Sequence, residues 1–275
     1  MYLVYWIYSK NDAKKSLQRI RGGKSLLNDV SEKEVGLSYV IKKSWAVYCQ
    51  QIKSITVLMI MVYAPVGIIH YIAAQYILKN PYIGIPIAIM EMFFWIIGGV
   101  GSVFIVDNAL RKDSVEMGVG AAVNKAFTRS GRYAITSLLA GLIIFGFCLL
   151  FVIPAIFPII NYIFIMQVVA LRGLRTKSAL KYSKSLVKGR WWKILWINFV
   201  IFLIFFITYL GFGFLSMLLP KIFGIIINLI LNVFQSGFFT VAITVLFLKL
   251  EAINMIAEKE ENEVESLSQE DSSNQ

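Results

Sequence analysis

The chain is poor in the residue types that build most catalytic and metal-binding sites. Its 275 residues include a single histidine, His70, and two cysteines, Cys49 and Cys148. So few ligands exclude a zinc site made of three or four His and Cys side chains, and one histidine leaves little room for a Ser-His-Asp triad. Both cysteines lie in or beside apolar runs, which predicts buried thiols rather than a disulfide. We therefore expect no enzyme activity, no metal and no cofactor.

Charged residues are scarce as well. Only 16% of the residues are charged and 58% are hydrophobic, whereas a soluble domain is typically about half apolar and a quarter charged. This composition excludes an ordinary water-soluble globule. It also excludes a disordered chain, because disorder requires low hydrophobicity. The sequence therefore predicts a protein that lies in a membrane.

Long apolar runs indicate where the chain crosses this membrane. A helix needs about 20 residues to cross the hydrocarbon core. The run at 134–171 is too long for one crossing and carries Pro154 and Pro158 near its middle, so we divide it into two spans. The six predicted spans are about 55–78, 82–106, 134–153, 157–171, 194–219 and 222–248.

The distribution of Lys and Arg predicts the orientation of these spans. The segments 1–54, 107–133 and 172–193 together carry 23 Lys and Arg, whereas the short turns on the other side carry only Lys79 and Lys221. Cytoplasmic loops carry the excess of Lys and Arg, so both termini are expected in the cytoplasm. This asymmetry also accounts for the net charge of +11 without nucleic-acid binding.

A basic amphipathic segment precedes each predicted hairpin of two spans. Such a helix lies flat in the membrane interface, and its lysines gain about 1 kcal/mol each near anionic headgroups. The predicted fold is therefore an all-α integral membrane protein with six transmembrane helices in three hairpins, each preceded by a cytoplasmic interfacial helix. These helices either anchor the hairpins or, in the segment before the third hairpin, form an anionic lipid or phosphate site. The candidate residues of that site are Lys177, Lys181, Lys184, Lys188 and Arg190.

The end of the third basic segment resembles a known family. Ser183 stands before an aliphatic pair and the run Lys-Gly-Arg-Trp-Trp at 188–192, directly ahead of a span. Together with the proline-containing turn at 152–154 and the topology over about 36–250, this layout resembles the bacterial membrane domains named after glycerophosphoryl diester phosphodiesterase and the related DUF975-type proteins. The resemblance implies an integral bacterial membrane protein of poorly known role. Some relatives carry a phosphodiesterase barrel of about 250 residues, for which this chain has no room.

Two ionisable residues fall within the predicted spans, where charge is costly and marks a functional candidate. His70 lies eight residues before the outer end of the first span, and Glu91 lies nine residues after the outer start of the second. In an antiparallel hairpin the two residues lie at nearly the same depth. We expect them to face each other, either as a hydrogen-bonded pair that fixes the hairpin or as a proton relay or substrate contact.

The sixth span carries a stripe of amides. Asn228, Asn232 and Gln235 follow one another at helical spacing and so share one face. Amides that face lipid would lack partners, so the stripe is expected to face the bundle. It either joins helices by hydrogen bonds or lines a path for a polar substrate. The expected partners are the amides of neighbouring spans, Asn161, Gln167 and Asn198.

These features divide the chain into a basic cytoplasmic segment at 1–35, a membrane domain at 36–250 and a cytoplasmic tail at 251–275, which holds eight acidic residues and one lysine. The expected partners are the bilayer, its anionic headgroups, and a membrane protein or a second copy of the chain. The favoured function is a non-enzymatic accessory, scaffold or protective factor of the bacterial cytoplasmic membrane. The alternative is a transporter or permease-like subunit for a lipid or a small amphipathic or peptide substrate.

Overall fold

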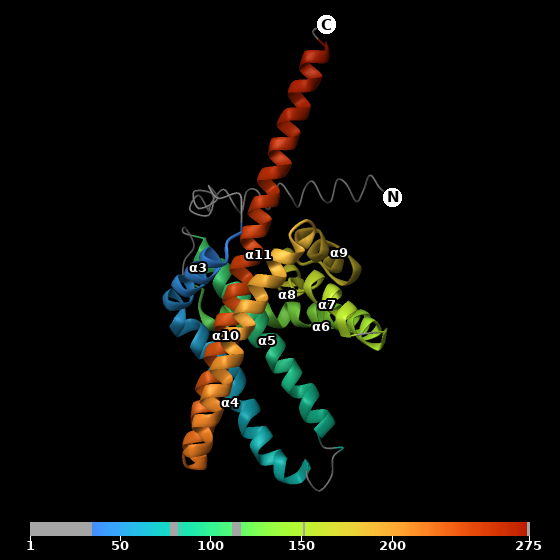
Figure 1. Ribbon diagram of the computed structural model, residues 1–275. Coiled ribbons are helices and arrows are strands. Elements are labelled where there is room, and N and C mark those ends of the chain that lie inside the picture. Colours follow the sequence, from blue (N-terminus) through green and yellow to red (C-terminus); the bar gives the residue numbers. More distant parts are fainter. Residues whose placement is uncertain (1–34, 78–81, 83, 112–116, 151, 274–275) are drawn as a thin grey trace.

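The computed structural model describes residues 35–77, 82, 84–111, 117–150 and 152–273, and every regular element in these ranges is a helix. Figure 1 shows helical hairpins that meet around the long C-terminal helix. The elements are α3 (Leu37–Gln50), α4 (Ile52–Ile77), α5 (Gly84–Leu110), α6 (Val119–Leu150), α7 (Val152–Asn161), α8 (Ile165–Gln167), the π-helical turn η3 (Val168–Arg172), α9 (Thr176–Val187), α10 (Trp191–Leu218) and α11 (Lys221–Ser273).

The structure confirms the all-α membrane fold with six spans. Six helical stretches are long and apolar enough to cross a membrane. They come in three hairpins, in the order that the sequence predicts. The stretches are Ile52–Ile69, Gly84–Leu110, Val119–Leu150, Pro154–Arg172, Trp191–Phe214 and Ile226–Ala257.

The centre of the bundle is formed by α5, α11 and the fourth span. Over an 18-residue stretch of each span, 50% of the residues are buried within the protein in α5 and in α11 and 56% in the fourth span, against 22% for α4 and α10 and 11% for α6. Small residues allow α4 to approach α5 closely, because a Cβ atom at Gly98 would lie only 3.2 Å from the Val62 side chain. On the other side α11 packs against α3, α4, α5 and α10.

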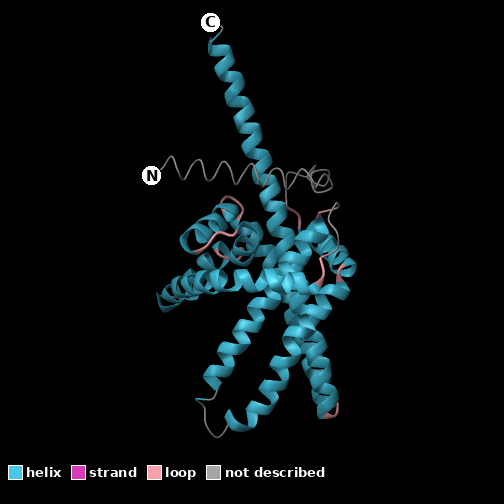
Figure 2. Cartoon of the chain, turned by 180° about the vertical axis from the view of Figure 1, so that it is seen from behind, coloured by secondary structure: helices cyan, strands magenta, loops and turns pink. Residues whose placement is uncertain are grey.

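The hairpin of α6 and α7 points in its own direction. Figures 1 and 2 show it lying across the line of α11, whereas the tips of the other two hairpins point away from the C-terminal end. The second basic amphipathic segment is the first part of α6, so the prediction of a separate interfacial helix before each hairpin was wrong for the second hairpin. The segment before the first hairpin ends at Gln51. The segment before the third hairpin ends at Gly189, whose φ is 81°. No residue with positive φ interrupts the segment before the second hairpin.

The fourth span is interrupted in its middle. A turn over residues 162–164 separates α7 from α8, and α8 passes directly into the π-helical turn. Because α7 begins at Val152, Pro154 lies in its first turn, where backbone N–H groups have no helical partner. The helix therefore starts before both prolines, so the turn predicted at 154–157 was wrong, and the break lies in the middle of the span at 162–164.

Gly173 ends the π-helical turn in the left-handed conformation. Its φ is 69°, which glycine adopts without steric cost. A Cβ atom at this position would collide with the Arg129 guanidinium on α6. Glycine here therefore allows α6 to pack against the end of the fourth span.

α9 packs its apolar side against protein rather than lipid. Ala179 and Val187 are fully buried and Leu186 is 3% exposed, and the helix contacts α6, α7, η3 and α11. The apolar stripe was expected in the membrane interface. It is covered by the bundle because Gly173 and Gly189 turn the chain sharply at the two ends of the helix.

Some predictions cannot be compared with the described residues. The segment at 1–34, the side chain of His70 and the turn at 78–81 lie outside them. The prediction for the cysteines was wrong in part: Cys49 and Cys148 are both free, but both are exposed. Each lies on a face of its helix that turns away from the core.

Candidate functional site

The most extensive polar contact in the described part of the chain joins α11 to the end of the fourth span. The Arg172 guanidinium binds the Glu251 carboxylate through both of its oxygens; Nε donates to Oε1 at 2.8 Å and Nη2 contacts Oε2. The Glu251 side chain is 1% exposed and that of Arg172 is 15% exposed. A paired geometry with two parallel hydrogen bonds is the strongest form of this interaction.

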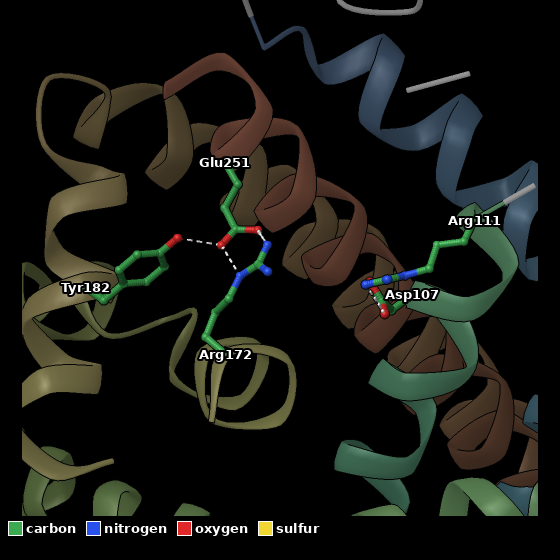
Figure 3. A network of polar contacts seen from close by, with 5 residues as sticks. All are labelled: Asp107, Arg111, Arg172, Tyr182 and Glu251. Carbon is green, nitrogen blue, oxygen red and sulfur yellow. Dashed lines mark hydrogen bonds and ion pairs between the residues drawn. The ribbon is translucent and has the colours of Figure 1, made fainter. Parts of the chain in front are cut away.

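Tyr182 on α9 completes this contact. Its hydroxyl donates to Glu251 Oε1 at 2.6 Å, and Figure 3 shows the three side chains converging between α9, η3 and α11. Burial and the adjacent Glu251 carboxylate raise the pKa of the Tyr182 phenol above its ordinary value of 10.0. The phenol is therefore a stable hydrogen-bond donor to the carboxylate at neutral pH.

Two further contacts hold the same part of α11. Arg190, between α9 and α10, donates through Nη1 to Asn254 Oδ1 at 2.7 Å. On the other side, Lys249 Nζ lies 4.6 Å from the centre of the Tyr39 ring of α3. We call this set of contacts the collar: Tyr39, Arg172, Tyr182 and Arg190 around Lys249, Glu251 and Asn254 of α11.

Helical geometry explains how one short stretch reaches three neighbours. Glu251 and Asn254 are three residues apart and lie on one face of α11, whereas Lys249 points about 200° away from Glu251. The first two residues face η3 and α9, and Lys249 faces α3. The collar therefore contacts α11 from opposite sides, near the end of its candidate span at Ala257.

A second ion pair lies nearby on α5. Arg111, directly after this helix, donates through Nη2 to Asp107 Oδ1 in its last turn at 2.9 Å. Figure 3 shows it apart from the Arg172 cluster. Because the two residues are four positions apart, the pair stabilises the C-terminal end of α5.

The amides predicted as a polar stripe mostly bond within their own helix. Asn228 donates to the Gly224 carbonyl at 2.8 Å and Asn232 to the Asn228 carbonyl at 2.7 Å. Gln235 reaches another helix, donating to the Phe205 carbonyl of α10 at 3.3 Å. The structure thus connects α11 to α10 at one of the three positions.

The expected partner amides find other neighbours. Gln167 Nε2 lies 3.5 Å from Thr244 Oγ1 of α11, and Asn198 donates to the Ile194 carbonyl of its own helix at 2.8 Å. At Asn161 it is the backbone carbonyl that accepts, from the Ser183 hydroxyl at 2.7 Å. None of these contacts joins one predicted amide to another.

The other candidate residues are placed as follows. Glu91 is half-buried on α5, and His70 lies on α4 with its side chain outside the described set, so their pairing stays a prediction. Arg190 belongs to the collar. The candidate lipid-contacting lysines are all exposed: Lys177, Lys181 and Lys184 on α9, and Lys188 directly after it.

The collar was not anticipated from the sequence. Glu251 was assigned to the solvated acidic tail and Arg172 to a basic loop, although both border long apolar runs. A signal was present, because opposite charges stand at the ends of two spans that reach the same side of the membrane. Their pairing joins residues 79 positions apart, which helical periodicity alone does not reveal.

Comparison of the chain with known protein families, with curated protein sequences and with solved structures finds no match. The resemblance at 188–192 therefore stays a prediction.

Proposed function

We propose that this chain is a non-enzymatic multi-pass protein of the bacterial cytoplasmic membrane that acts as an accessory or scaffold factor. In this role it presents the C-terminal part of α11 to a partner in the cytoplasm. A protective role, in which the chain shields the membrane or a membrane complex, would use the same presented helix.

The observation that carries this proposal is the way the bundle holds α11. This element is one continuous helix of 53 residues, about 80 Å long at 1.5 Å per residue. Figures 1 and 2 show its C-terminal part extending well beyond the other described helices. The collar contacts α11 just before this extension. Its contacts with α3, η3 and α9 therefore set the direction in which the extension points.

The composition of the extension indicates the chemistry of the partner. Residues 258–271 contain seven acidic residues and one lysine. Opposite charge on a partner would speed its association and select it over acidic competitors. A basic surface on a cytoplasmic or membrane protein is therefore the expected counterpart.

Native mass spectrometry of the full-length protein, extracted gently from its own membrane, tests this role. We expect a protein partner at fixed stoichiometry. If the partner contacts one face of the extension, neutralising that face releases it, while neutralising the opposite face does not. The two matched variants carry Glu→Gln at Glu258, Glu261 and Glu265 and at Glu260, Glu263 and Glu270.

Two results would contradict the scaffold role. One is a chain that carries no protein partner in any membrane preparation. The other is a partner that remains bound in both variants, which would place the contact away from α11.

A carrier function is the second candidate, and one observation favours it. The fourth span is broken at residues 162–164, and interrupted helices near the middle of a span are typical of substrate sites in transporters. Close to this break Gln167 is fully buried, and its Oε1 has no hydrogen-bond partner in the described part of the chain. A lipid or small amphipathic substrate would have a polar contact here.

Transport measured in vesicles separates the two functions. A carrier would lose flux in the Gln167→Leu or Glu91→Gln variants and keep its flux when the acidic extension is neutralised. A scaffold would show the reverse dependence in its partner binding.

A further inference from the structure

α9 presents a row of fixed positive charges. Lys177, Lys181, Lys184 and Lys188 are all exposed, and at 100° per residue they fall within an arc of about 60°. The row is about 16 Å long at 1.5 Å per residue. No acidic residue occurs anywhere in 172–193, so the row meets no neutralising charge within its own segment.

The helix that carries these lysines is held rigidly by the bundle. Its first residue, Thr176, donates its backbone N–H to Thr136 Oγ1 of α6 at 2.9 Å. In the middle, the Ser183 hydroxyl donates to the Asn161 carbonyl at 2.7 Å, and Tyr182 bonds to Glu251. Because its apolar side is covered by protein, α9 cannot rotate about its axis, and its lysines stay on the outer surface of the bundle.

Aromatic residues set the level of the row relative to the membrane. The candidate span of α10 begins at Trp191, three residues after Lys188. Trp192 is 75% exposed and Trp196 is 60% exposed, and exposed tryptophans at the end of a span are typical of the headgroup region. The row of lysines therefore ends where lipid headgroups begin.

We propose that this face of α9 binds the phosphate groups of anionic phospholipids in the adjoining leaflet. Lysine ammonium groups are suited to phosphate as point charges. On α6, which packs against α9, Lys125 and Arg132 are also exposed and extend the positive surface. The inference does not rest on the proposed scaffold role, because a carrier with this fold would present the same surface.

Lipid competition in native mass spectrometry tests the site. The full-length protein is equilibrated with equal amounts of phosphatidylglycerol and phosphatidylcholine, and the ratio of the two bound lipids is measured. We expect a preference for phosphatidylglycerol that weakens as salt is added. The Lys181→Gln/Lys184→Gln variant should lose about fivefold of this preference per lysine at low salt, which is 1 kcal/mol expressed as an affinity ratio.

The matched control removes the same charge elsewhere. Lys42 on α3 and Lys53 on α4 are exposed as well but lie on different helices, so the Lys42→Gln/Lys53→Gln variant should lose clearly less of the lipid preference than the α9 variant. Lys181→Arg/Lys184→Arg should keep the wild-type lipid ratio, which shows that charge and not fold is responsible.

Two outcomes would overturn the proposal. One is an equal loss of preference in the α9 variant and in the α3 and α4 control, which would indicate nonspecific attraction. The other is an unchanged lipid ratio in the α9 variant together with the loss of a bound protein or second copy, which would assign the row to an acidic protein surface.

Discussion

α6 and α11 are two long apolar helices with opposite places in the molecule. The span of α6 has a mean hydropathy of 2.3, and that of α11 has 1.9. Yet over an 18-residue stretch of each span only 11% of the residues are buried in the protein in α6, against 50% in α11. The more apolar helix is the peripheral one. In a membrane, lipid solvates apolar side chains as well as protein does, so hydropathy does not decide which helix is central.

Polar side chains account for the difference. α11 buries Lys249 and Glu251, whose charged groups have no good partner in lipid. The buried Thr240 and Thr244 hydroxyls bond to carbonyls of α11 itself. The described part of α6 buries Ser130 and Thr136, both near its attachment to α9. The central helix is thus the one whose charged side chains must be buried in protein. Substitutions of individual residues test this difference between the two helices.

The largest effect is expected at Glu251. Glu251→Gln leaves the Arg172 guanidinium buried without its counter-charge, and breaking a buried pair in this way costs about 3–5 kcal/mol. Denaturant unfolding in mild detergent measures the loss. The exposed Arg132 on α6 provides the control, because Arg132→Gln should change the free energy of unfolding by less than about 0.5 kcal/mol. Equal effects of the two variants would remove the distinction between the helices.

The double replacement Arg172→Met/Glu251→Leu sharpens this test. Apolar residues in place of a whole buried pair are often neutral, so this variant should be more stable than Glu251→Gln alone. A double variant as unstable as the single one would show that packing, and not the uncompensated charge, causes the loss.

Tyr182→Phe removes the third member of this contact. A hydrogen bond to a charged group contributes about 1.5–3 kcal/mol, and the same unfolding measurement should show a loss of this size. A loss below about 0.5 kcal/mol would mean that Arg172 alone satisfies the carboxylate.

The pH dependence at Tyr182 has a definite sign. Its folded pKa is raised above the unfolded value of 10.0, so the neutral phenol stabilises the fold fully below about pH 10 and this contribution is lost as the pH rises further. Between about pH 9 and pH 11 the wild type should therefore lose more stability than Tyr182→Phe. Parallel pH profiles of the two proteins would contradict this expectation.

Glycine-to-alanine changes compare the two helices directly. A Cβ at Gly237 of α11 would lie 2.9 Å from Ile55 and 3.2 Å from Tyr48, whereas a Cβ at Gly141 of α6 meets nothing within 4 Å. Gly237→Ala should cost about 1–3 kcal/mol by overpacking. Gly141→Ala should gain up to about 1 kcal/mol from helix propensity. Thermal unfolding of both variants gives the two signs, and a loss in both would show that α6 is packed after all.

The smallest effect is expected where α6 is attached. Thr136→Val removes the acceptor of the Thr176 backbone N–H, at a cost of about 1 kcal/mol. Hydrogen exchange at Thr176 should rise in this variant and remain unchanged in Thr128→Val, where the hydroxyl bonds only within α6, to the Lys125 carbonyl. Unchanged exchange in both would mean that other contacts hold α9.

The spans could be predicted more closely than the site. Six apolar stretches and the turn near 220 followed from composition and length, and the structure has them. The turn predicted at 154–157 was wrong, because these residues lie within α7. The path of α6 through residues 119–130, the break at 162–164 and the covered side of α9 did not follow, because each depends on how a helix end meets its neighbours. Gly173 and Gly189 were visible in the sequence, but their left-handed φ values were not.

The sequence by itself determined that this chain is a membrane protein with six spans. Transfer of about 20 apolar residues into hydrocarbon depends on composition alone, so no tertiary contact is needed to predict it. Only the tertiary structure decided that α11 is central, that Arg172, Tyr182 and Glu251 meet, and that the apolar face of α9 is covered by the bundle. These contacts join groups 69 and 79 positions apart, and packing alone brings them together.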